Sequence, residues 1–581
     1  MPETAPQSNL RALVSWRGVF LQLALAAASG LLLSAAFPPL ECGLLAWLAL
    51  TPLLLFRIPL ALSRRVLLGY VFGAACFVTN LFWLNTIGFG AGVWLGLFYA
   101  LFLMLWYLLV GGLVFLFAER RAAAGRALGL WEVPMGKQCL LVLLLPAAWV
   151  ALEWVRSWLF TGFPWNQLGI SQWQRQNLLP LATVTGVYGI SFLLVAVNVA
   201  LAMSWRHMVQ GWGTRERRGP SWPLLVAVLL LVPVLYLSSR QPRLRGPDDV
   251  LRVLAVQGCI PQCRVWSDAQ FTDSLETYTS LSRAGVATGV RPDLIVWPET
   301  AVPVPLISDE KNREGMARRY PDIGRYHSTL MSLIAAVKTP FLIGAIDSRS
   351  AGGPTLVPPD PETAPTFNSA MLLDADGKVI EVYDKMHRVP FGEYTPFGQY
   401  LPWLVRWIGM GRDLTPGREY SILHLPKEVS AGVMICYEDA FPGIAREFVL
   451  RGAALLITLT NDAWYAESAG SRQHLLHAVL RAAETRRPLL RSGNNSDTCL
   501  IWPDGRITGL LVDRMTGQRF VRGSQLYDVP IWRNLPLTWY TRHGDLFAQL
   551  CALVTAAGTV WVMIGWWRGK EQRLEKITRK R

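Results

Sequence analysis

The stretch Gly432-Val-Met-Ile-Cys-Tyr-Glu438 decides the fold of the C-terminal half of this chain. A short apolar run ends in the thiol of Cys436, which is the pattern of a buried β-strand that delivers a side chain at its carboxyl end. Glu299 and Lys385 each follow another apolar run in the same way. Functional groups in α/β sheets gather at the carboxyl ends of strands. We therefore expect a carboxylate, an amine and a thiol to meet at one edge.

The residues around these three side chains resemble the Glu, Lys and Cys motifs of the nitrilase superfamily. Taken singly, a Cys is most often a small buried hydrophobic residue, and a Glu or Lys is most often a surface group. Three matches in the right order and spacing outweigh those interpretations. The matching segments are Pro292-Asp-Leu-Ile-Val-Trp-Pro-Glu299, Tyr383-Asp-Lys-Met-His-Arg-Val-Pro-Phe-Gly-Glu393 and Gly432-Val-Met-Ile-Cys-Tyr-Glu438.

The resemblance implies an αββα sandwich and a role for each residue. Cys436 would be the nucleophile, Glu299 the proton acceptor, and Lys385 the group that stabilises the tetrahedral oxyanion. Glu393 would orient Lys385 or the base, and Tyr437 with Glu438 would shape the site. For Glu438 an alternative stays open, because a carboxylate there could simply anchor the start of a helix.

The rest of the chain predicts a membrane protein. It has 581 residues, of which 52% are hydrophobic, and 25 Trp, which is too apolar for a purely soluble protein of this length. Several runs of about 17–25 mostly apolar residues are long enough to span a bilayer as helices. We expect spans near residues 19–37, 42–57, 66–84, 91–117, 139–155, 181–204, 222–239 and 546–567.

Charge predicts the orientation of these spans. Arg and Lys are concentrated in alternate loops and after the last span, so the positive-inside rule places both termini in the cytoplasm. These loops account for much of the net charge of +15, and the sequence has no motif of a nucleic-acid-binding module. We expect an N-terminal bundle of about seven helices in residues 1–240, an exported domain in 245–535, a C-terminal span at 546–567 and a basic tail at 568–581. In a bacterium the exported domain would lie in the periplasm.

The exported region predicts a layered α/β domain, because strand-like and helix-like runs alternate along it. Hairpin turns are expected at Asp376-Gly377 and Asp504-Gly505. The chain's eight cysteines are too sparse for a disulfide framework. Cys259 and Cys263 lack further metal ligands at suitable spacing, so we expect neither a metal nor another cofactor.

Taken over its whole length, the chain resembles the apolipoprotein N-acyltransferase family, in which membrane spans bracket a nitrilase-like domain. Ala463 and Ser471 depart from that family's usual Ser and Pro. The resemblance implies an enzyme of the bacterial inner membrane that transfers an acyl chain from a phospholipid, through a thioester, to a diacylated apolipoprotein. We expect the enzyme to be a monomer. Supporting segments are Gly162-Phe-Pro-Trp-Asn-Gln167, Val256-Gln-Gly-Cys-Ile-Pro-Gln262, Asn461-Asp-Ala-Trp464 and Arg486-Arg-Pro-Leu-Leu-Arg491.

Aromatic residues suggest how lipid could reach the site. The segment 401–410 contains Trp403 and Trp407 and is predicted to form either a mobile lid or a helix packed on the domain's own core. Trp165, Trp266 and Trp464 are candidates to line the lipid path, although an ordinary interfacial role suits a Trp equally well.

Two other functions remain open from the sequence. One is a membrane-tethered amidase or nitrilase that hydrolyses small amides, and the other is a non-catalytic scaffold that retains the fold. The product discriminates the first, since an acyltransferase yields an acylated lipoprotein and a lysophospholipid, whereas an amidase yields ammonia. Trapping by a thiol alkylator discriminates the second.

Overall fold

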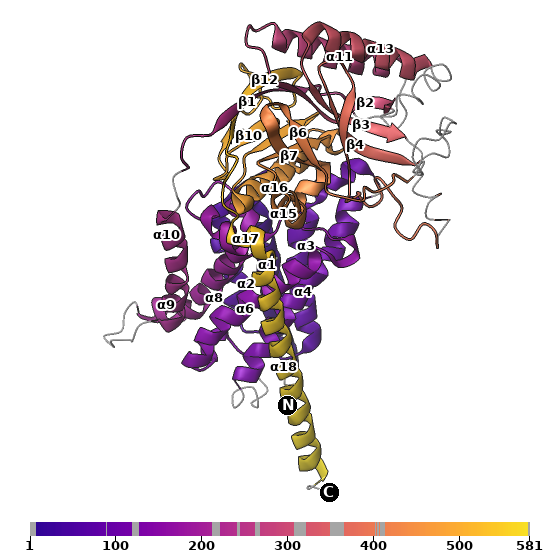
Figure 1. The fold of residues 1–581 in the computed structure, drawn as a ribbon. Coiled ribbons are helices and arrows are strands. Elements are labelled where there is room, and N and C mark those ends of the chain that lie inside the picture. Colours follow the sequence, from indigo (N-terminus) through magenta and orange to yellow (C-terminus); the bar gives the residue numbers. More distant parts are fainter. Residues whose placement is uncertain are drawn as a thin grey trace. The chain divides into compact units, whose positions relative to one another are not determined.

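The chain folds into two compact units, a helical unit (Met1–Arg240 with Asp545–Arg581) and a sheet unit (Gln241–Gly544). The structure is a computed structural model, drawn in Figure 1. It describes residues 7–88, 90–118, 127–211, 221–240, 244–261, 268–306, 321–348, 365–400, 403, 406 and 413–578.

The helical unit is built from long apolar helices, as expected. Among the residues that the structure describes, seven helices are long and apolar enough to cross a membrane. Pro233 lies in the first turn of α10 and cannot donate a backbone hydrogen bond, which accounts for the break between α9 and α10. The helices are α1 Gln7–Ala35, α3 Leu62–Asn80, α4 Ala91–Phe117, α6 Met135–Arg156, α8 Val187–Gly211, the pair α9 Trp222–Leu229 and α10 Leu231–Ser239, and α18 Leu546–Thr578.

The expected helical span at 42–57 is wrong. This stretch forms a 3-10 turn, η1 (Gly43–Trp47), and a single helical turn, α2 (Thr51–Leu54). Pro52 has no backbone N–H, and the side chain of Asn198 accepts hydrogen bonds from the backbone of Leu50 and Thr51 at 2.9 and 3.2 Å. A side chain from another helix thus satisfies backbone donors here, which a hydropathy window cannot detect.

The same stretch nevertheless contacts segments that precede and follow α6 in the sequence. At its start, the carbonyl of Gly43 accepts a bond from Gln172, in the segment that follows α6. At its end, Ile58 pairs with Leu128, in the segment that precedes α6. Because α6 separates these two segments in the sequence, we infer that residues 43–58 cross the helical unit as a broken segment rather than as one helix.

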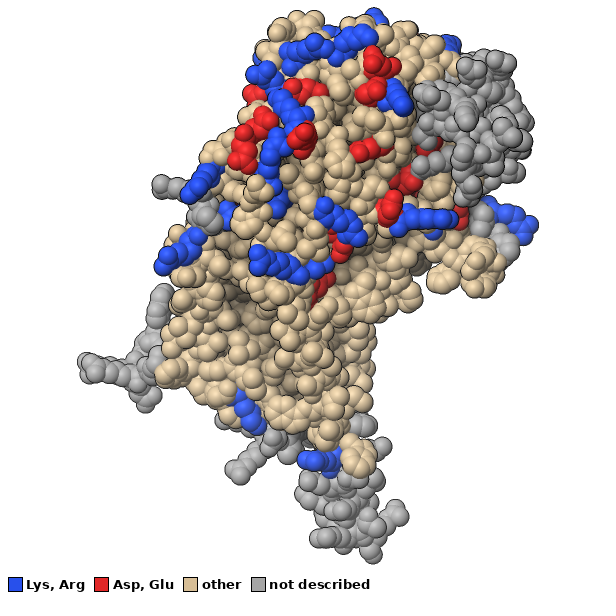
Figure 2. Space-filling model, viewed as in Figure 1, with Lys and Arg blue, Asp and Glu red and all other residues tan. Residues whose placement is uncertain are grey.

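The surface of the helical unit is apolar. Large hydrophobic side chains of α18 such as Leu553, Val560 and Met563 are exposed, and the face seen in Figure 2 carries few charged side chains over these helices. Within the unit, Gly73 lies so close to Ala100 that a Cβ would reach 2.7 Å from its Cα. Close contact through small residues is typical of helices that pack in a bilayer.

The sheet unit is an αββα sandwich, which confirms the expected fold class. Helices α11 (Asp268–Val286) and α13 (Pro321–Val337) cover one sheet, and α15 (Pro442–Leu450) and α16 (Ala469–Thr485) cover the other (Figure 1). The first sheet has the order β12-β1-β2-β3-β4-β5 and the second β11-β10-β9-β8-β7-β6. The strands are β1 Asp249–Gln257, β2 Leu294–Leu306, β3 Phe341–Ser348, β4 Thr366–Leu373, β5 Val379–Asp384, β6 Ile422–Leu425, β7 Val429–Ile435, β8 Leu455–Thr460, β9 Leu489–Gly493, β10 Cys499–Ile501, β11 Ile507–Thr508 and β12 Gly523–Ile531.

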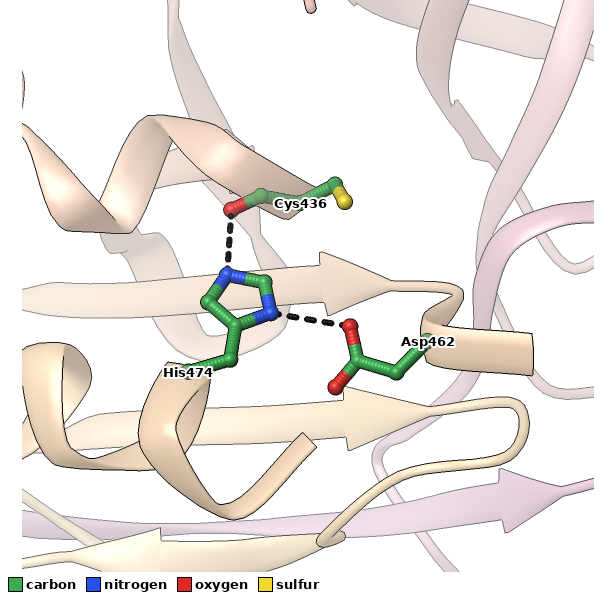
Figure 3. Close-up of side chains that lie close together, drawn as sticks. All are labelled: Cys436, Asp462 and His474. Carbon is green, nitrogen blue, oxygen red and sulfur yellow. Dashed lines mark hydrogen bonds and ion pairs between the residues drawn. The ribbon is translucent and has the colours of Figure 1, made fainter. Parts of the chain in front are cut away.

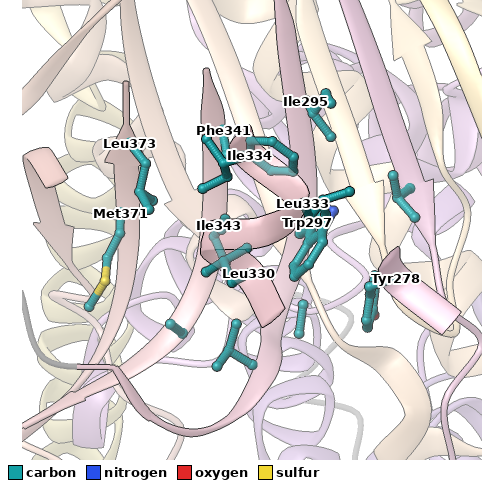
Figure 4. Packing of buried hydrophobic residues seen from close by; sticks show 14 of the residues in the cluster. Tyr278, Ile295, Trp297, Leu330, Leu333, Ile334, Phe341, Ile343, Met371 and Leu373 are labelled. Carbon is teal, nitrogen blue, oxygen red and sulfur yellow. The ribbon is translucent and has the colours of Figure 1, made fainter. Parts of the chain in front are cut away.

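A large aromatic residue anchors β2 immediately before Glu299. Trp297 is fully buried, with ring centroids of Tyr278 and Phe341 at 5.1 and 5.7 Å (Figure 4). Its indole N–H donates to Ser282 on α11 at 3.0 Å. Burial of a side chain of this size stabilises by roughly 1.5–3 kcal/mol, so the strand that leads into the site is firmly held.

Candidate active site

Glu299 lies at an irregularity in β2. The pairing of β2 with β3 shifts register between Trp297 and Val302, and Thr300 has a φ of +48°. Such a bulge re-aims a side chain out of the regular alternation of a strand. Gly344 on β3 makes room for it, because a Cβ there would lie 2.6 Å from the Cα of Glu299 and closer still to the carbonyl oxygen of Pro298.

Lys385 follows the end of β5 and is buried between two carboxylates. Its Nζ lies 3.3 Å from Oε1 of Glu299 and 2.9 Å from Oε1 of Glu393, and its side chain is 2% exposed. Burial favours the neutral amine, but Glu393 and Glu299 outweigh it and raise the pKa of Lys385 well above its usual value. The amine is therefore a fixed cation that can act on developing negative charge.

Two asparagines fix the orientation of Glu299. The side-chain amide of Asn368, on β4, donates to Oε1 of Glu299 at 2.8 Å and to Oε1 of Glu393 at 2.9 Å. The backbone N–H of Asn461, just after β8, donates to Oε2 of Glu299 at 2.8 Å. With Lys385 these make three donors on one carboxylate, which leaves its orientation little freedom.

Cys436 stands at a sharp turn after β7. Its φ of +53° is in the left-handed region, which a non-glycine residue rarely adopts, and the side chain is buried. Burial raises the pKa of the Cys436 thiol well above its usual value, Glu299 raises it further, and Lys385 offsets this only in part. The resting thiol thus carries its proton, and a neighbouring base has to remove it before the sulfur can attack.

Glu438 joins the ends of two strands. Its Oε1 accepts from the backbone N–H groups of Met386 and His387, at 2.7 and 3.0 Å, and its Oε2 accepts from Ile435 N at 2.8 Å. The hydroxyl of Tyr383 donates to the same carboxyl at 2.9 Å. Burial raises the pKa of Glu438 to about 7, although these hydrogen bonds work against the rise. Glu438 therefore fixes the segment after Lys385 against the segment that carries Cys436.

A second set of buried charges lies beside Cys436 and was not predicted from the sequence. His474 Nδ1 is 2.8 Å from Asp462 Oδ1, and its Nε2 is 3.2 Å from the carbonyl oxygen of Cys436 (Figure 3). The same Nε2 lies 3.0 Å from Asp439 Oδ1. Burial alone lowers the pKa of His474, but Asp439 and Asp462 outweigh it and raise that pKa to about 9. His474 is therefore a buried cation at neutral pH.

The geometry argues against a metal centre at this cluster. The ligand atoms of Cys436, Asp462 and His474 lie within 4.8 Å of one another, which is compatible with a small ion. Both nitrogens of His474, however, already contact carboxylate or carbonyl oxygens. An imidazole that is protonated at both nitrogens has no lone pair to offer a metal.

The candidate tryptophans that the structure describes differ in their exposure. Trp165, in the helical unit, is buried and stacks on Phe163, with ring centroids 5.9 Å apart. In the sheet unit, Trp403 is 59% and Trp464 44% exposed. Trp266 and Trp407 lie outside the described residues. Trp403 and Trp464 can therefore meet a ligand without rearrangement, whereas Trp165 packs inside its own unit.

Tyr437, the other proposed shaping residue, packs beside the turn. Its ring lies edge-on to Phe441 at 4.9 Å and near His387 at 5.8 Å. The side chain is buried, so it helps to keep water away from Cys436.

The arrangement of Glu299, Lys385 and Cys436 at strand ends of an αββα sandwich defines a nitrilase-type domain. A carbon-nitrogen hydrolase model matches residues 252–517, and a model of the apolipoprotein N-acyltransferase N-terminal domain matches residues 29–200. An amidase of the nitrilase superfamily from Nesterenkonia is a similar solved structure, at 16% identity and a TM-score of 0.35, covering 53% of this chain and 97% of the amidase.

Relatives that align over most of the chain identify the family within this class of nitrilase-type proteins. The apolipoprotein N-acyltransferase of Geobacter metallireducens is 32% identical over 541 residues, covering 92% of this chain and 94% of the relative. That of Chlorobaculum tepidum is 30% identical and covers 90% of this chain and 93% of the relative. The chain belongs to the apolipoprotein N-acyltransferase family.

The close approach of Gly344 to Glu299 gives a first prediction. Gly344→Ala should displace Glu299 and slow the alkylation of Cys436 by iodoacetamide by about tenfold, because the thiol then lacks its proton acceptor. The measurement is the rate at which the peptide that contains Cys436 becomes alkylated, followed by mass spectrometry. Gly443→Ala is the matched control, since a Cβ there would meet nothing within 4 Å. Equal rates in the two variants would contradict the prediction.

Proposed function

We propose that this protein transfers an acyl chain from a phospholipid, through a thioester on Cys436, to the α-amino group of the diacylglyceryl-cysteine that begins an apolipoprotein. One observation carries the proposal. A buried carboxylate–ammonium pair is coupled to a buried thiol, in a chain whose other unit is made of membrane-length helices. One chain supplies all of these groups, so we propose that a monomer is active.

The first half-reaction forms the thioester. Glu299 accepts the proton of the Cys436 thiol while the sulfur attacks the ester carbonyl carbon of the phospholipid. Lys385 and the backbone N–H of Tyr437 stabilise the oxyanion of the tetrahedral intermediate. The carbon–oxygen bond then breaks, and Glu299 returns the proton to the departing alcohol oxygen, which releases a lysophospholipid.

The second half-reaction transfers the acyl chain to an amine. The acceptor nitrogen attacks the thioester carbon, and Glu299 takes a proton from that nitrogen. The carbon–sulfur bond breaks to leave an amide, and Glu299 reprotonates the sulfur of Cys436. Glu299 thus carries one proton in each half-reaction and ends each in its starting state.

Burial of the site favours transfer over hydrolysis. Cys436, Lys385 and Glu299 are all buried, and water that reached the thioester would destroy it. A tethered amidase would use the same three residues but would require access for water and a small amide. An apolar helical unit of this size also exceeds what a tether requires.

The central prediction is a covalent intermediate. Purified protein incubated with phospholipid carrying a radiolabelled acyl chain, and no acceptor, should acquire a label that hydroxylamine removes. Cys436→Ala should lose it completely, whereas Cys499→Ala, a fully buried cysteine on β10, should retain it. Release of ammonia from amides with no acyl-enzyme would support the amidase instead.

We propose that the sheet unit lies in the periplasm and both termini in the cytoplasm. The six membrane-length helices or helix pairs before residue 241 would return the chain to its starting side. A broken crossing at residues 43–58 would add a seventh passage, which the contacts of Gly43 and Ile58 support. With seven passages the sheet unit would lie on the side of the membrane opposite the N-terminus, and α18 would return the chain to the cytoplasm. The basic residues near both ends agree with this orientation.

Labelling with a membrane-impermeant maleimide checks this topology. In spheroplasts, Asp376→Cys should be labelled above the background of the parent chain, because this turn residue's side chain is 84% exposed. Arg568→Cys should be labelled only after lysis. The opposite pattern would place the thiol on the wrong side for exported lipoproteins.

We propose that the segment around Trp403 meets the lipid surface. The residues just before it expose large aromatic side chains, Phe391, Phe397 and Tyr400, and Trp403 is exposed as well. Such a group of exposed aromatics suits the boundary between headgroups and acyl chains. Their proposed role is to admit the acyl donor and then cover the site.

Trp403→Ala should slow acyl-enzyme formation from phospholipid vesicles by about tenfold or more, because an anchoring aromatic is lost from the lipid boundary. The thermal midpoint should stay close to that of the wild type, since the side chain is exposed. Met515→Ala, which removes another exposed apolar side chain of the sheet unit, serves as the control. A large drop in thermal midpoint with unchanged acylation would mark Trp403 as an ordinary packing residue.

A further inference from the structure

The turn that presents the thiol depends on a buried support. Cys436 adopts a φ of +53°, a conformation that L-residues hold only where their surroundings enforce it. The carbonyl oxygen of the same residue lies 3.2 Å from Nε2 of His474 (Figure 3). The sulfur of the same residue lies within 4.8 Å of a ring nitrogen of His474. The hydrogen bond of His474 is thus to the backbone of the turn, and the thiol lies nearby.

Three charged groups from three different elements surround His474. Asp439 is on the turn η8 (Cys436–Ala440), Asp462 on η9 (Asp462–Tyr465) and Arg491 on β9. Arg491 lies 2.6 Å from Asp439 Oδ2 and 3.2 Å from Asp462 Oδ2, so it holds the carboxylate oxygens that His474 does not contact. All four side chains are fully buried. Two cations and two anions balance, which makes such burial tolerable.

The protonation of His474 suits this role. The groups that face it are the two carboxylates, the Arg491 guanidinium and Cys436. A charged imidazole carries a hydrogen on each nitrogen. It can donate one to Asp462 and the other to the Cys436 carbonyl, while Asp439 Oδ1 lies 3.0 Å from Nε2 as an ion pair.

The same support also reaches the base. Asp462 is the direct neighbour of Asn461, whose backbone N–H holds Oε2 of Glu299 at 2.8 Å. Of these two successive residues after β8, Asn461 therefore fixes Glu299, and Asp462 belongs to the His474 cluster. A shift of this cluster would alter the distance between Glu299 and the thiol.

We propose that His474 is a positioning residue. It holds the backbone of Cys436 by a hydrogen bond and, through Asp462 and Asn461, fixes the distance between the thiol and Glu299. This inference rests on the proposed function, in which Cys436 is the nucleophile. His474 itself touches no substrate.

The test compares two histidines of one helix in the full-length protein in detergent. His474→Gln removes the charge and one of the two donors. His477→Gln is the same amino-acid substitution one turn further along α16, at an equally buried position. Two rates are measured: single-turnover acylation by labelled phospholipid over a range of concentrations, and alkylation of Cys436 by iodoacetamide.

His474→Gln should lower the saturating acylation rate by about 10- to 100-fold. The half-saturating phospholipid concentration should be unchanged, because lipid binding does not involve His474. Alkylation of Cys436 should slow as well, whereas both rates in His477→Gln should stay within about twofold of the wild type. A folded His474→Gln protein with wild-type acylation and alkylation would overturn the proposal.

Asp439→Asn provides a second variant that keeps the size of the side chain and one oxygen acceptor for His474. It should change both rates in the same direction as His474→Gln. If both variants lost their thermal transition, the cluster would be needed for folding itself and the positioning role would be rejected. If wild type and His477→Gln formed no thioester, the proposed function would fail, while alkylation would still report on the position of Cys436.

Discussion

The buried ammonium of Lys385 is the constraint on which the rest of the site depends. Removing an unpaired ammonium from water costs several kcal/mol, and only close carboxylates offset this cost. Glu299 and Glu393 supply them, and Asn368 holds both carboxylates in place. Loss of either carboxylate would therefore leave an uncompensated charge as well as remove a contact.

This pairing explains how one buried site can hold a base, a cation and a thiol at once. The cation stays protonated because of its carboxylates, and the thiol stays protonated because burial and Glu299 disfavour its anion. The charge that develops on a substrate oxygen during attack would meet Lys385 directly, without the reorganisation that water would require. A dry site thus suits an acyl transfer whose intermediate water would destroy.

The sequence was sufficient to predict the catalytic candidates at the strand ends, but not the residues that hold them in place. Glu299, Lys385 and Cys436 each follow an apolar run, so their convergence could be expected from the rule for carboxyl ends of strands. Asn368 sits inside a strand and His474 inside a helix, where no local pattern separates a site residue from a packing residue. Their partners lie 69 and 38 positions away in the chain, and only the folded sheets bring them together.

In the helical unit, hydropathy predicted the long helices but not the local backbone of a short apolar stretch. Hydropathy found the long helices because length and apolarity alone determine whether a helix can span. It failed at residues 42–57 because Pro52 and the distant amide of Asn198 decide the local backbone there. Trp165 is buried and stacks on Phe163, and its role on the lipid path stays a prediction.

The candidate site is divided between the two sheets. Glu299, Asn368 and Lys385 come from β2, β4 and the end of β5, whereas Cys436 and Asn461 follow β7 and β8. Two polar contacts cross from one sheet to the other at this edge: Asn461 to Glu299, and Tyr383 to Glu438. The docking of the sheets and the assembly of the site are therefore one event. A partly unfolded sandwich would keep neither the base nor the cation beside the thiol, and the thiol would then lack the groups that activate it.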